Sequence, residues 1–184
     1  MNFNKAIFLD RDGTLNRCIV TNSSNNFKSR PPRNIEELKV YDDITILNSF
    51  LKNFYLIIIT NQPDINRGLQ SHEFNDFINS EILKKINIKK IFTCYCHDSE
   101  KGCNCYKPAP GMILNAVKEF NIDIKHSYFI GDTWRDIELC KNTNLKSILI
   151  DRGYYKLMKN NFTLRKLKPD YIITSLLDIK KIIK

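Results

Sequence analysis

Residues 7–16, IFLDRDGTLN, decide the fold and place the first chemistry. An apolar run of this length, continuing from Ala6, is typical of a strand buried in a parallel sheet. Two carboxylates, Asp10 and Asp12, come directly after the run, and Gly13 allows a turn. Because ligands bind at the carboxyl ends of parallel strands, we expect both carboxylates at a binding site. Two acids so close together repel each other unless a cation lies between them.

The composition is that of one globular domain spanning residues 1–184. The chain is 42% hydrophobic and 27% charged, which is ordinary for a protein with a substantial core. No apolar run approaches the about 18 residues that span a bilayer, and no long apolar leader precedes the first strand. We therefore expect a cytoplasmic protein with no membrane partner, working as a monomer.

The net charge of +9 raises the question of a nucleic-acid partner. The lysines are scattered along the chain, however, and no dense arginine block is present. The charge pattern therefore predicts a cationic surface around a site for small anionic substrates and disfavours nucleic acid.

Strands alternate with helical segments along the chain, which predicts a single α/β domain with a doubly wound parallel sheet and helices on both faces. Between the first strand and the first helix, the polar segment 17–34 is too long for a turn, and we expect a loop that sets specificity. Further strands are predicted at 55–60, 89–95, 127–132, 146–151 and the start of 170–183, and helices at 43–53, 73–87, 111–120, 136–142 and the end of 170–183.

Polar residues end several of these strands. Parallel neighbours bring their ends to one edge of the sheet, so we expect these residues to meet the first pair of carboxylates. Carboxylates, a lysine and a hydroxyl gathered there form a site for a phosphate and a divalent cation, and oxygen ligands of this kind suit Mg²⁺. The residues are Thr60, Asn61, Lys107, Asp132 and Asp136.

Four of the six cysteines form two C-x-C pairs in the segment 94–107. Two such pairs across a short loop can supply four thiolates to a tetrahedral Zn²⁺. A structural Zn²⁺ would fix this loop and, with it, the lysine that follows. We assign Cys94, Cys96, Cys103 and Cys105 as ligands, with His97 as an alternative to its neighbour.

These motifs occur in a familiar order. DRDGT, a hydroxyl residue ending the second strand, a lysine before a proline and GDTWRD make the chain resemble, over nearly its whole length, the haloacid dehalogenase superfamily of phosphatases. NQPDINRG, KPAPGM after the cysteines and GDTWRDIE narrow the resemblance to its small, capless, zinc-containing branch. That branch contains the D-glycero-D-manno-heptose-1,7-bisphosphate 7-phosphatases and the histidinol-phosphatases.

The resemblance implies a Rossmann-like core without a large cap and a Mg²⁺-dependent phosphomonoesterase that works through an aspartyl-phosphate. The favoured reaction removes the 7-phosphate of a heptose bisphosphate during the synthesis of surface polysaccharide precursors, those of lipopolysaccharide, capsule or S-layer. Histidinol phosphate and a polynucleotide 3′-phosphate remain alternative substrates. A zinc-stabilised binding module without turnover is the non-enzyme alternative.

Carried over to this sequence, the resemblance implies a role for each residue. Asp10 is the nucleophile and Asp12 the general acid and base. Thr60 and Lys107 stabilise the phosphoryl group. The residues that contact the substrate are Asn61, Arg67 and Tyr106. The Mg²⁺ ligands are Asp10, the backbone carbonyl of Asp12, Asp132 and Asp136.

The sequence departs from this family at Tyr106, where its members usually carry an arginine thought to help recognise the substrate. A tyrosine cannot neutralise a second phosphate. Within segment 17–34, Lys28, Arg30 and Arg33 are candidate replacements for that charge.

Overall fold

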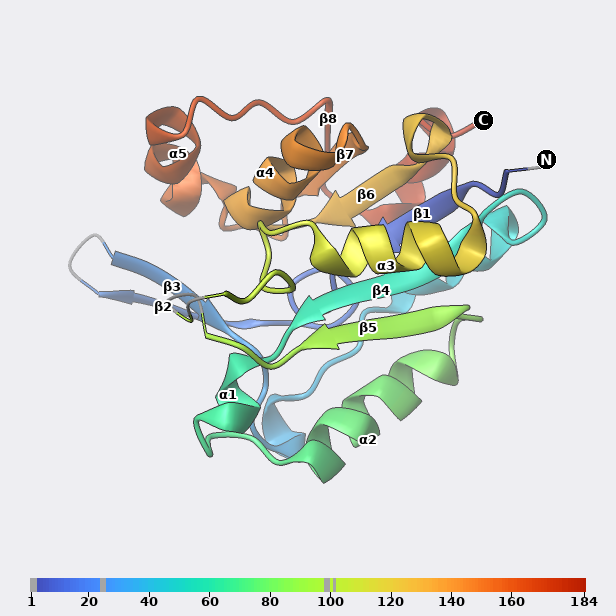
Figure 1. Cartoon of the computed structure of the whole chain (residues 1–184). Coiled ribbons are helices and arrows are strands. Elements are labelled where there is room, and N and C mark those ends of the chain that lie inside the picture. The colour runs from blue at the N-terminus through green and yellow to red at the C-terminus, as the bar shows by residue number, and fades with distance from the viewer. Residues whose placement is uncertain (1–2, 24–25, 98–99, 101) are drawn as a thin grey trace.

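A six-stranded parallel sheet forms the centre of the computed structural model, which describes residues 3–23, 26–97, 100 and 102–184 (Figure 1). The strand order is β5-β4-β1-β6-β7-β8, with every neighbouring pair parallel. The chain therefore starts in the middle, moves outward through β4 and β5, and returns to the other side at β6. The strands are β1 (Ala6–Leu9), β4 (Tyr55–Asn61), β5 (Lys90–Cys94), β6 (Tyr128–Gly131), β7 (Lys146–Ile150) and β8 (Tyr171–Ile173).

Helices cover both faces of this sheet, as predicted (Figure 1). The α-helices are α1 (Pro63–Asn66), α2 (His72–Leu83), α3 (Gly111–Phe120), α4 (Trp134–Thr143) and α5 (Tyr155–Leu164). The 3₁₀ segments are η1 (Ile35–Glu37), η2 (Asp42–Phe50), η3 (Ile124–His126) and η4 (Leu176–Lys181).

The alternation of side chains in β1 shows how one strand serves two cores. Ile7 and Leu9 belong to the cluster that includes residues of α2, η2 and η4. Ala6 and Phe8 point the other way and join the cluster that includes residues of α3 and α4. All four side chains are fully buried. The predicted doubly wound α/β fold is therefore confirmed.

The segment 17–34 differs from its prediction as a loop. It contains an antiparallel hairpin, β2 (Ile19–Ser23) and β3 (Asn26–Arg30), beside the edge of the sheet to which the strand arrows point (Figure 1). Three successive β-branched residues, from Ile19, favour the strand conformation. The predicted role of this segment in specificity stays a prediction, and its residues 24 and 25 lie outside the described part of the chain.

Several helical segments also differ from the predictions, and the short helix α1 was not predicted. The expected helix 43–53 is the 3₁₀ segment η2, and the C-terminal helix is the 3₁₀ segment η4. Helix α5 was not predicted, because no capping side chain marks its start. Tertiary packing holds it instead, through the buried side chains of Met158 and Phe162.

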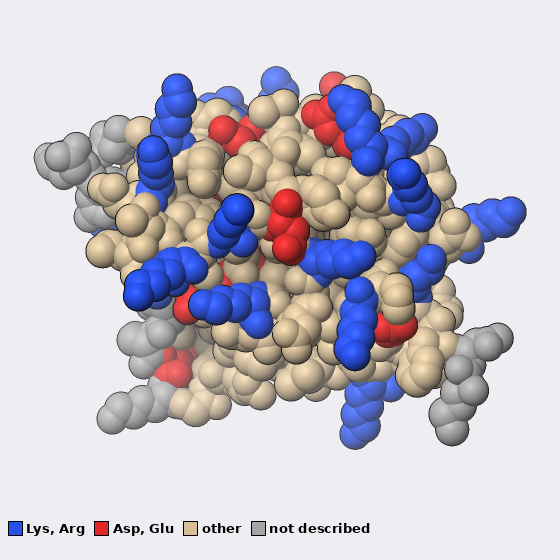
Figure 2. All heavy atoms as spheres, turned by 90° about the horizontal axis from the view of Figure 1, so that it is seen from above, with Lys and Arg blue, Asp and Glu red and all other residues tan. Residues whose placement is uncertain are grey.

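The surface agrees with the scattered charge of the sequence. Figure 2 shows Lys and Arg side chains spread over one face and separated by uncharged residues and by Asp or Glu. Among the described residues, no helix has both the length and the apolar character that a bilayer crossing demands.

Candidate active site

The predicted carboxylates meet where the strand order changes direction. Asp10 follows β1, Asp132 follows β6, and Asp136 lies in the first turn of α4. One oxygen from each of the three lies within 4.8 Å of the others, and all three residues are buried. This is the position at which open α/β sheets bind their ligands. The structure thus brings together the acids that the sequence analysis expected at one edge of the sheet.

Lys107 joins two of these acids. Its Nζ lies 2.5 Å from Asp10 Oδ1 and 2.7 Å from Asp136 Oδ1. Burial works to lower the pKa of Lys107, but the two carboxylates outweigh it and raise the pKa above its usual range. Burial raises the pKa of the Asp10 carboxyl to about 6, against the lowering effect of the lysine. A charged lysine therefore lies beside the predicted nucleophile.

Asn61 holds the backbone of Lys107, and Asp136 is itself held by Thr133. Asn61 Oδ1 accepts from the Lys107 backbone N–H at 3.0 Å, and Asn61 Nδ2 donates to the Lys107 carbonyl at 3.3 Å. Asn61 was predicted to contact the substrate; it lines the pocket, but the structure gives its amide a positioning role. Asp136 Oδ2 accepts from the backbone N–H and hydroxyl of Thr133 and so also caps α4.

Asp12 is held by partners that the sequence analysis missed. Its Oδ2 accepts from Arg11 at 3.0 and 3.2 Å and from Gln62 at 2.6 Å. The Arg11 side chain is fully buried and also donates to Asn75 and Asn79 of α2. The sequence does carry a signal for the pairing of Arg11 with Asp12, namely an arginine between two acids at the end of a buried strand, because a buried charge needs a partner.

Thr60 lies among the same partners. Gln62 Nε2 donates to the Thr60 hydroxyl oxygen at 2.8 Å, and both side chains are buried. Because its oxygen accepts this bond, the hydroxyl hydrogen of Thr60 is left to point at a ligand. Thr60 is buried at the end of β4 and does not line the pocket over Asp10, so its role in binding the phosphoryl group stays a prediction.

The charge of the cluster fits a divalent cation. Three carboxylates face one ammonium, which leaves an excess of negative charge. Burial and the charges of Asp10 and Asp136 raise the pKa of Asp132 well above its usual range. Asp132 Oδ2 accepts from the Tyr154 hydroxyl, whereas buried Oδ1 has no partner among the described residues. Oxygen ligands with spare negative charge suit Mg²⁺.

Gly13 is required by the same cluster. Its φ of +97° lies in the left-handed region, and a Cβ there would collide with Asp132 Oδ2. Glycine alone therefore lets the turn after the two aspartates approach the third.

The four cysteines of segment 94–107 also converge, although residues 98, 99 and 101 lie outside the described part of the chain. Their sulfurs lie within 4.8 Å of one another. Sγ–Sγ distances are 3.5 Å for Cys103–Cys105, 3.7 Å for Cys96–Cys105 and 3.8 Å for Cys94–Cys103. A tetrahedral Zn²⁺ with Zn–S bonds of about 2.3 Å separates its sulfurs by about 3.8 Å.

The sulfurs of Cys94 and Cys105 also lie close enough for a disulfide bond. A disulfide and a four-thiolate metal site exclude each other, because oxidised sulfurs do not act as thiolate ligands. A disulfide would involve only two of the four sulfurs, whereas all four converge, so the arrangement as a whole fits a zinc site better. Within the described residues His97 is not part of this cluster.

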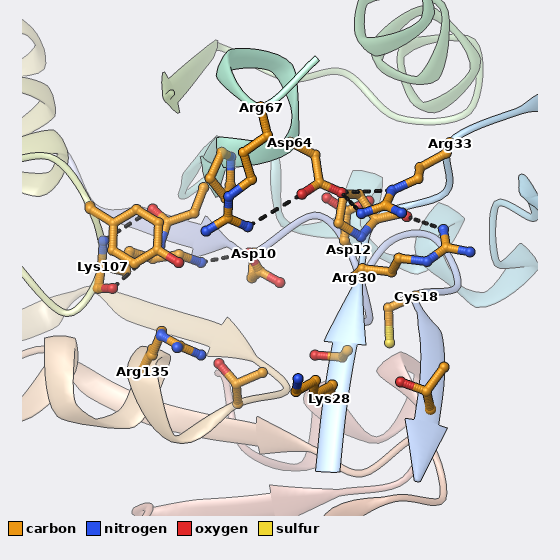
Figure 3. Close-up of a pocket in the computed structure, with 17 residues that line it drawn as sticks. Asp10, Asp12, Cys18, Lys28, Arg30, Arg33, Asp64, Arg67, Lys107 and Arg135 are labelled. Atoms are coloured by element: carbon orange, nitrogen blue, oxygen red, sulfur yellow. Dashed lines mark hydrogen bonds and ion pairs between the residues drawn. The ribbon is translucent and has the colours of Figure 1, made fainter. Parts of the chain in front are cut away.

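A pocket of about 560 Å³ opens over Asp10, the predicted nucleophile (Figure 3). The predicted substrate contacts Arg67 and Tyr106 both line it. Its wall is strongly cationic, since in addition to Lys107 it contains Lys28, Arg30, Arg33, Arg67 and Arg135.

Comparison with known proteins agrees with this site. A family model described as HAD-hydrolase-like matches residues 104–179. The D-glycero-beta-D-manno-heptose-1,7-bisphosphate 7-phosphatase of Pasteurella multocida is 30% identical, covering 98% of this chain and 97% of that protein. The D-glycero-alpha-D-manno-heptose-1,7-bisphosphate 7-phosphatase of Campylobacter jejuni is 35% identical over 79% of this chain and 81% of that protein.

Among solved structures, a D,D-heptose 1,7-bisphosphate phosphatase from B. bronchiseptica, complexed with magnesium and phosphate, has the same fold. Its TM-score is 0.75 at 21% identity, with 97% of each chain covered. The protein is thus a phosphatase of the haloacid dehalogenase class, a hydrolase of phosphoric monoesters. Within that class, the chain belongs to the family of D-glycero-D-manno-heptose-1,7-bisphosphate 7-phosphatases, which confirms the resemblance in its motifs.

Proposed function

We propose that this protein removes the 7-phosphate of D-glycero-D-manno-heptose 1,7-bisphosphate, in the synthesis of surface polysaccharide precursors. Relatives named for this reaction match most of the chain, and they include enzymes of both the alpha and the beta anomer. The observation that carries the chemistry is Lys107 Nζ, bonded to both Asp10 and Asp136 at the base of a cationic pocket.

The reaction begins with Asp10. An Asp10 carboxylate oxygen attacks phosphorus, the bond from phosphorus to the sugar oxygen breaks, and Asp12 gives its proton to that leaving oxygen. Asp12 then takes a proton from water, whose oxygen attacks the aspartyl-phosphate. This second step releases inorganic phosphate and restores the Asp10 carboxylate. Thr60 and Lys107 donate to the phosphoryl oxygens as charge shifts between them.

Two metals belong to this proposal. Mg²⁺, held by the carboxylates of Asp10, Asp132 and Asp136 and the carbonyl of Asp12, would supply positive charge against the phosphoryl oxygens. The unpartnered Oδ1 of Asp132 supports this assignment. Zn²⁺ on the four cysteines would make rigid the loop that ends at Lys107.

Phosphate release measured with Mg²⁺ over a small panel tests the proposal. The panel contains both anomers of heptose 1,7-bisphosphate, histidinol phosphate and a 3′-phosphorylated oligonucleotide. We expect a strong preference for one heptose anomer and no turnover in the Asp10→Asn variant. Preference for histidinol phosphate or the oligonucleotide would mean that this compound, and not a heptose bisphosphate, is the substrate. Release of phosphate from none of them would favour the zinc-stabilised binding module without turnover. Unchanged turnover in the variant would overturn the covalent mechanism.

A further inference from the structure

Two arginines on one wall of the pocket share a single buried carboxylate. Asp64 Oδ2 accepts from Arg33 Nε at 2.9 Å and lies 2.8 Å from its Nη2, while Asp64 Oδ1 accepts from Arg67 Nη1 at 3.4 Å. Arg33 lies between β3 and η1, and Arg67 caps the end of α1. Figure 3 shows the three side chains in a row, with Asp10 and Asp12 beside them.

The exposure of this arginine pair suits an anionic ligand. The Asp64 side chain is 4% exposed, whereas the side chains of Arg33 and Arg67 are 33% and 42% exposed. Although Asp64 also lines the pocket, the guanidinium groups are therefore far more exposed to a ligand than the carboxylate that joins them. One carboxylate neutralises only one of the two arginines, so the trio carries a net positive charge. Planar guanidinium groups bind phosphate through paired hydrogen bonds.

The other cations of the pocket are less suited to this task. Arg30 is already bonded through two nitrogens to Glu37, at 2.6 and 2.7 Å. Lys28 is exposed on the hairpin, and the guanidinium of Arg135 lies 4.6 Å from the ring centre of Trp134. In the arginine pair, two chain segments are held by one buried partner, which fixes both groups before a ligand arrives.

We propose that Arg33 and Arg67, positioned by Asp64, bind the distal phosphate of a bisphosphorylated sugar while Asp10 attacks the other phosphate. The inference rests on the proposed function and names the groups that select for a second phosphate. It also places positive charge in a pocket where Tyr106 contributes none.

The test compares a bisphosphate with its monophosphate in each variant. The readout is the ratio of kcat/KM for heptose 1,7-bisphosphate to that for heptose 7-phosphate. Hydrogen bonds to charged groups contribute enough that Arg33→Met or Arg67→Met should lower this ratio by about 10- to 100-fold. Arg33→Lys should lower the ratio less than Arg33→Met does, because lysine keeps the positive charge but lacks the paired N–H donors of the guanidinium group. Matched controls from the same pocket, Lys28→Met and Arg135→Met, should keep the ratio within about twofold.

Several outcomes would overturn the inference. An equal fall in kcat/KM for the bisphosphate and the monophosphate would mean that the arginines only support the fold. A fall in the ratio for Lys28→Met or Arg135→Met would mean that the distal phosphate binds at those cations instead. If the wild-type protein releases no phosphate from the heptose substrates, the proposed function is wrong. The same ratio is then measured with fructose 1,6-bisphosphate and fructose 6-phosphate. A wild-type ratio near one in both pairs would then overturn the arginine subsite as well. Turnover of p-nitrophenyl phosphate reports independently that each variant is folded and active.

Discussion

Replacing Tyr154 with phenylalanine removes a single hydroxyl from the carboxylate cluster and measures its contribution to cation binding. That hydroxyl bonds Asp132 Oδ2 and lies 3.5 Å from the Gly13 carbonyl. The residue is only 7% exposed, so bulk water does not replace the lost donor. With the hydroxyl gone, the Asp132 carboxylate loses the side-chain hydrogen bond that orients it among the described residues. Binding a cation must then also order this side chain.

The size of the effect follows from these contacts. Loss of a partner that orients a metal ligand typically weakens metal affinity by about 10- to 100-fold. At a fixed Mg²⁺ concentration well above saturation, the stabilisation that Mg²⁺ gives should fall by about 1.4 to 2.7 kcal/mol. For a domain of this size, that loss corresponds to about 3 to 11 °C less Mg²⁺-induced increase in Tm.

The assay is a Mg²⁺ titration read in two ways, by Tm in scanning fluorimetry and by phosphate release. Tyr154→Phe should shift both midpoints to higher Mg²⁺ by the same factor. Tyr155→Phe is the matched control, because that neighbouring ring packs on Phe162 in α5 and not on the carboxylate cluster. If the two variants bind Mg²⁺ equally well, the hydroxyl does not orient Asp132 and the reasoning is wrong.

Three further predictions test other parts of the structure. Asn61→Ala removes both bonds to the Lys107 backbone, and we expect kcat to fall by about tenfold in steady-state assays; an unchanged kcat would refute the positioning role. Cys96→Ser should abolish zinc binding, measured by atomic spectroscopy, and lower Tm by several degrees; full zinc content would contradict the assignment. The hydrogen bonds from Arg30 lower the pKa of Glu37 from 4.5 to about 2. Glu37 therefore stabilises the fold above pH 4.5, and this contribution disappears as the pH falls toward 2. In urea unfolding, Arg30→Met should reduce that loss by about 1 kcal/mol, and parallel curves for the two proteins would count against the pair.

The sequence was most informative where local pattern and tertiary fold agree. The apolar run before Asp10 has to be buried on both faces, and the alternating helices supply the cover, so the parallel sheet could be predicted. The same logic placed Asp132 and Lys107 at one edge, because strand ends in such a sheet converge. The comparisons confirm the class of enzyme that these motifs imply, while the role of each residue stays a prediction.

Features that depend on long-range partners could not be read from the sequence. Helix α5 has no capping signal and is held because Met158 and Phe162 pack in one cluster with residues of α4 and β7. The bond from Tyr154 to Asp132 joins residues 22 positions apart, and no local pattern marks it. Arg33 was seen only as a candidate charge, because its partner Asp64 lies in a different segment.

The buried acids also bear on how the protein trades stability against activity. Asp10, Asp132 and Asp136 lie within reach of one another and out of water, and one lysine does not balance them. Their mutual repulsion opposes folding, so a chain selected for thermal resistance alone would exchange one of them for a neutral residue. Keeping all three marks a position where selection for turnover has outweighed selection for a more durable fold. Thermostabilising substitutions should therefore be sought away from this edge of the sheet.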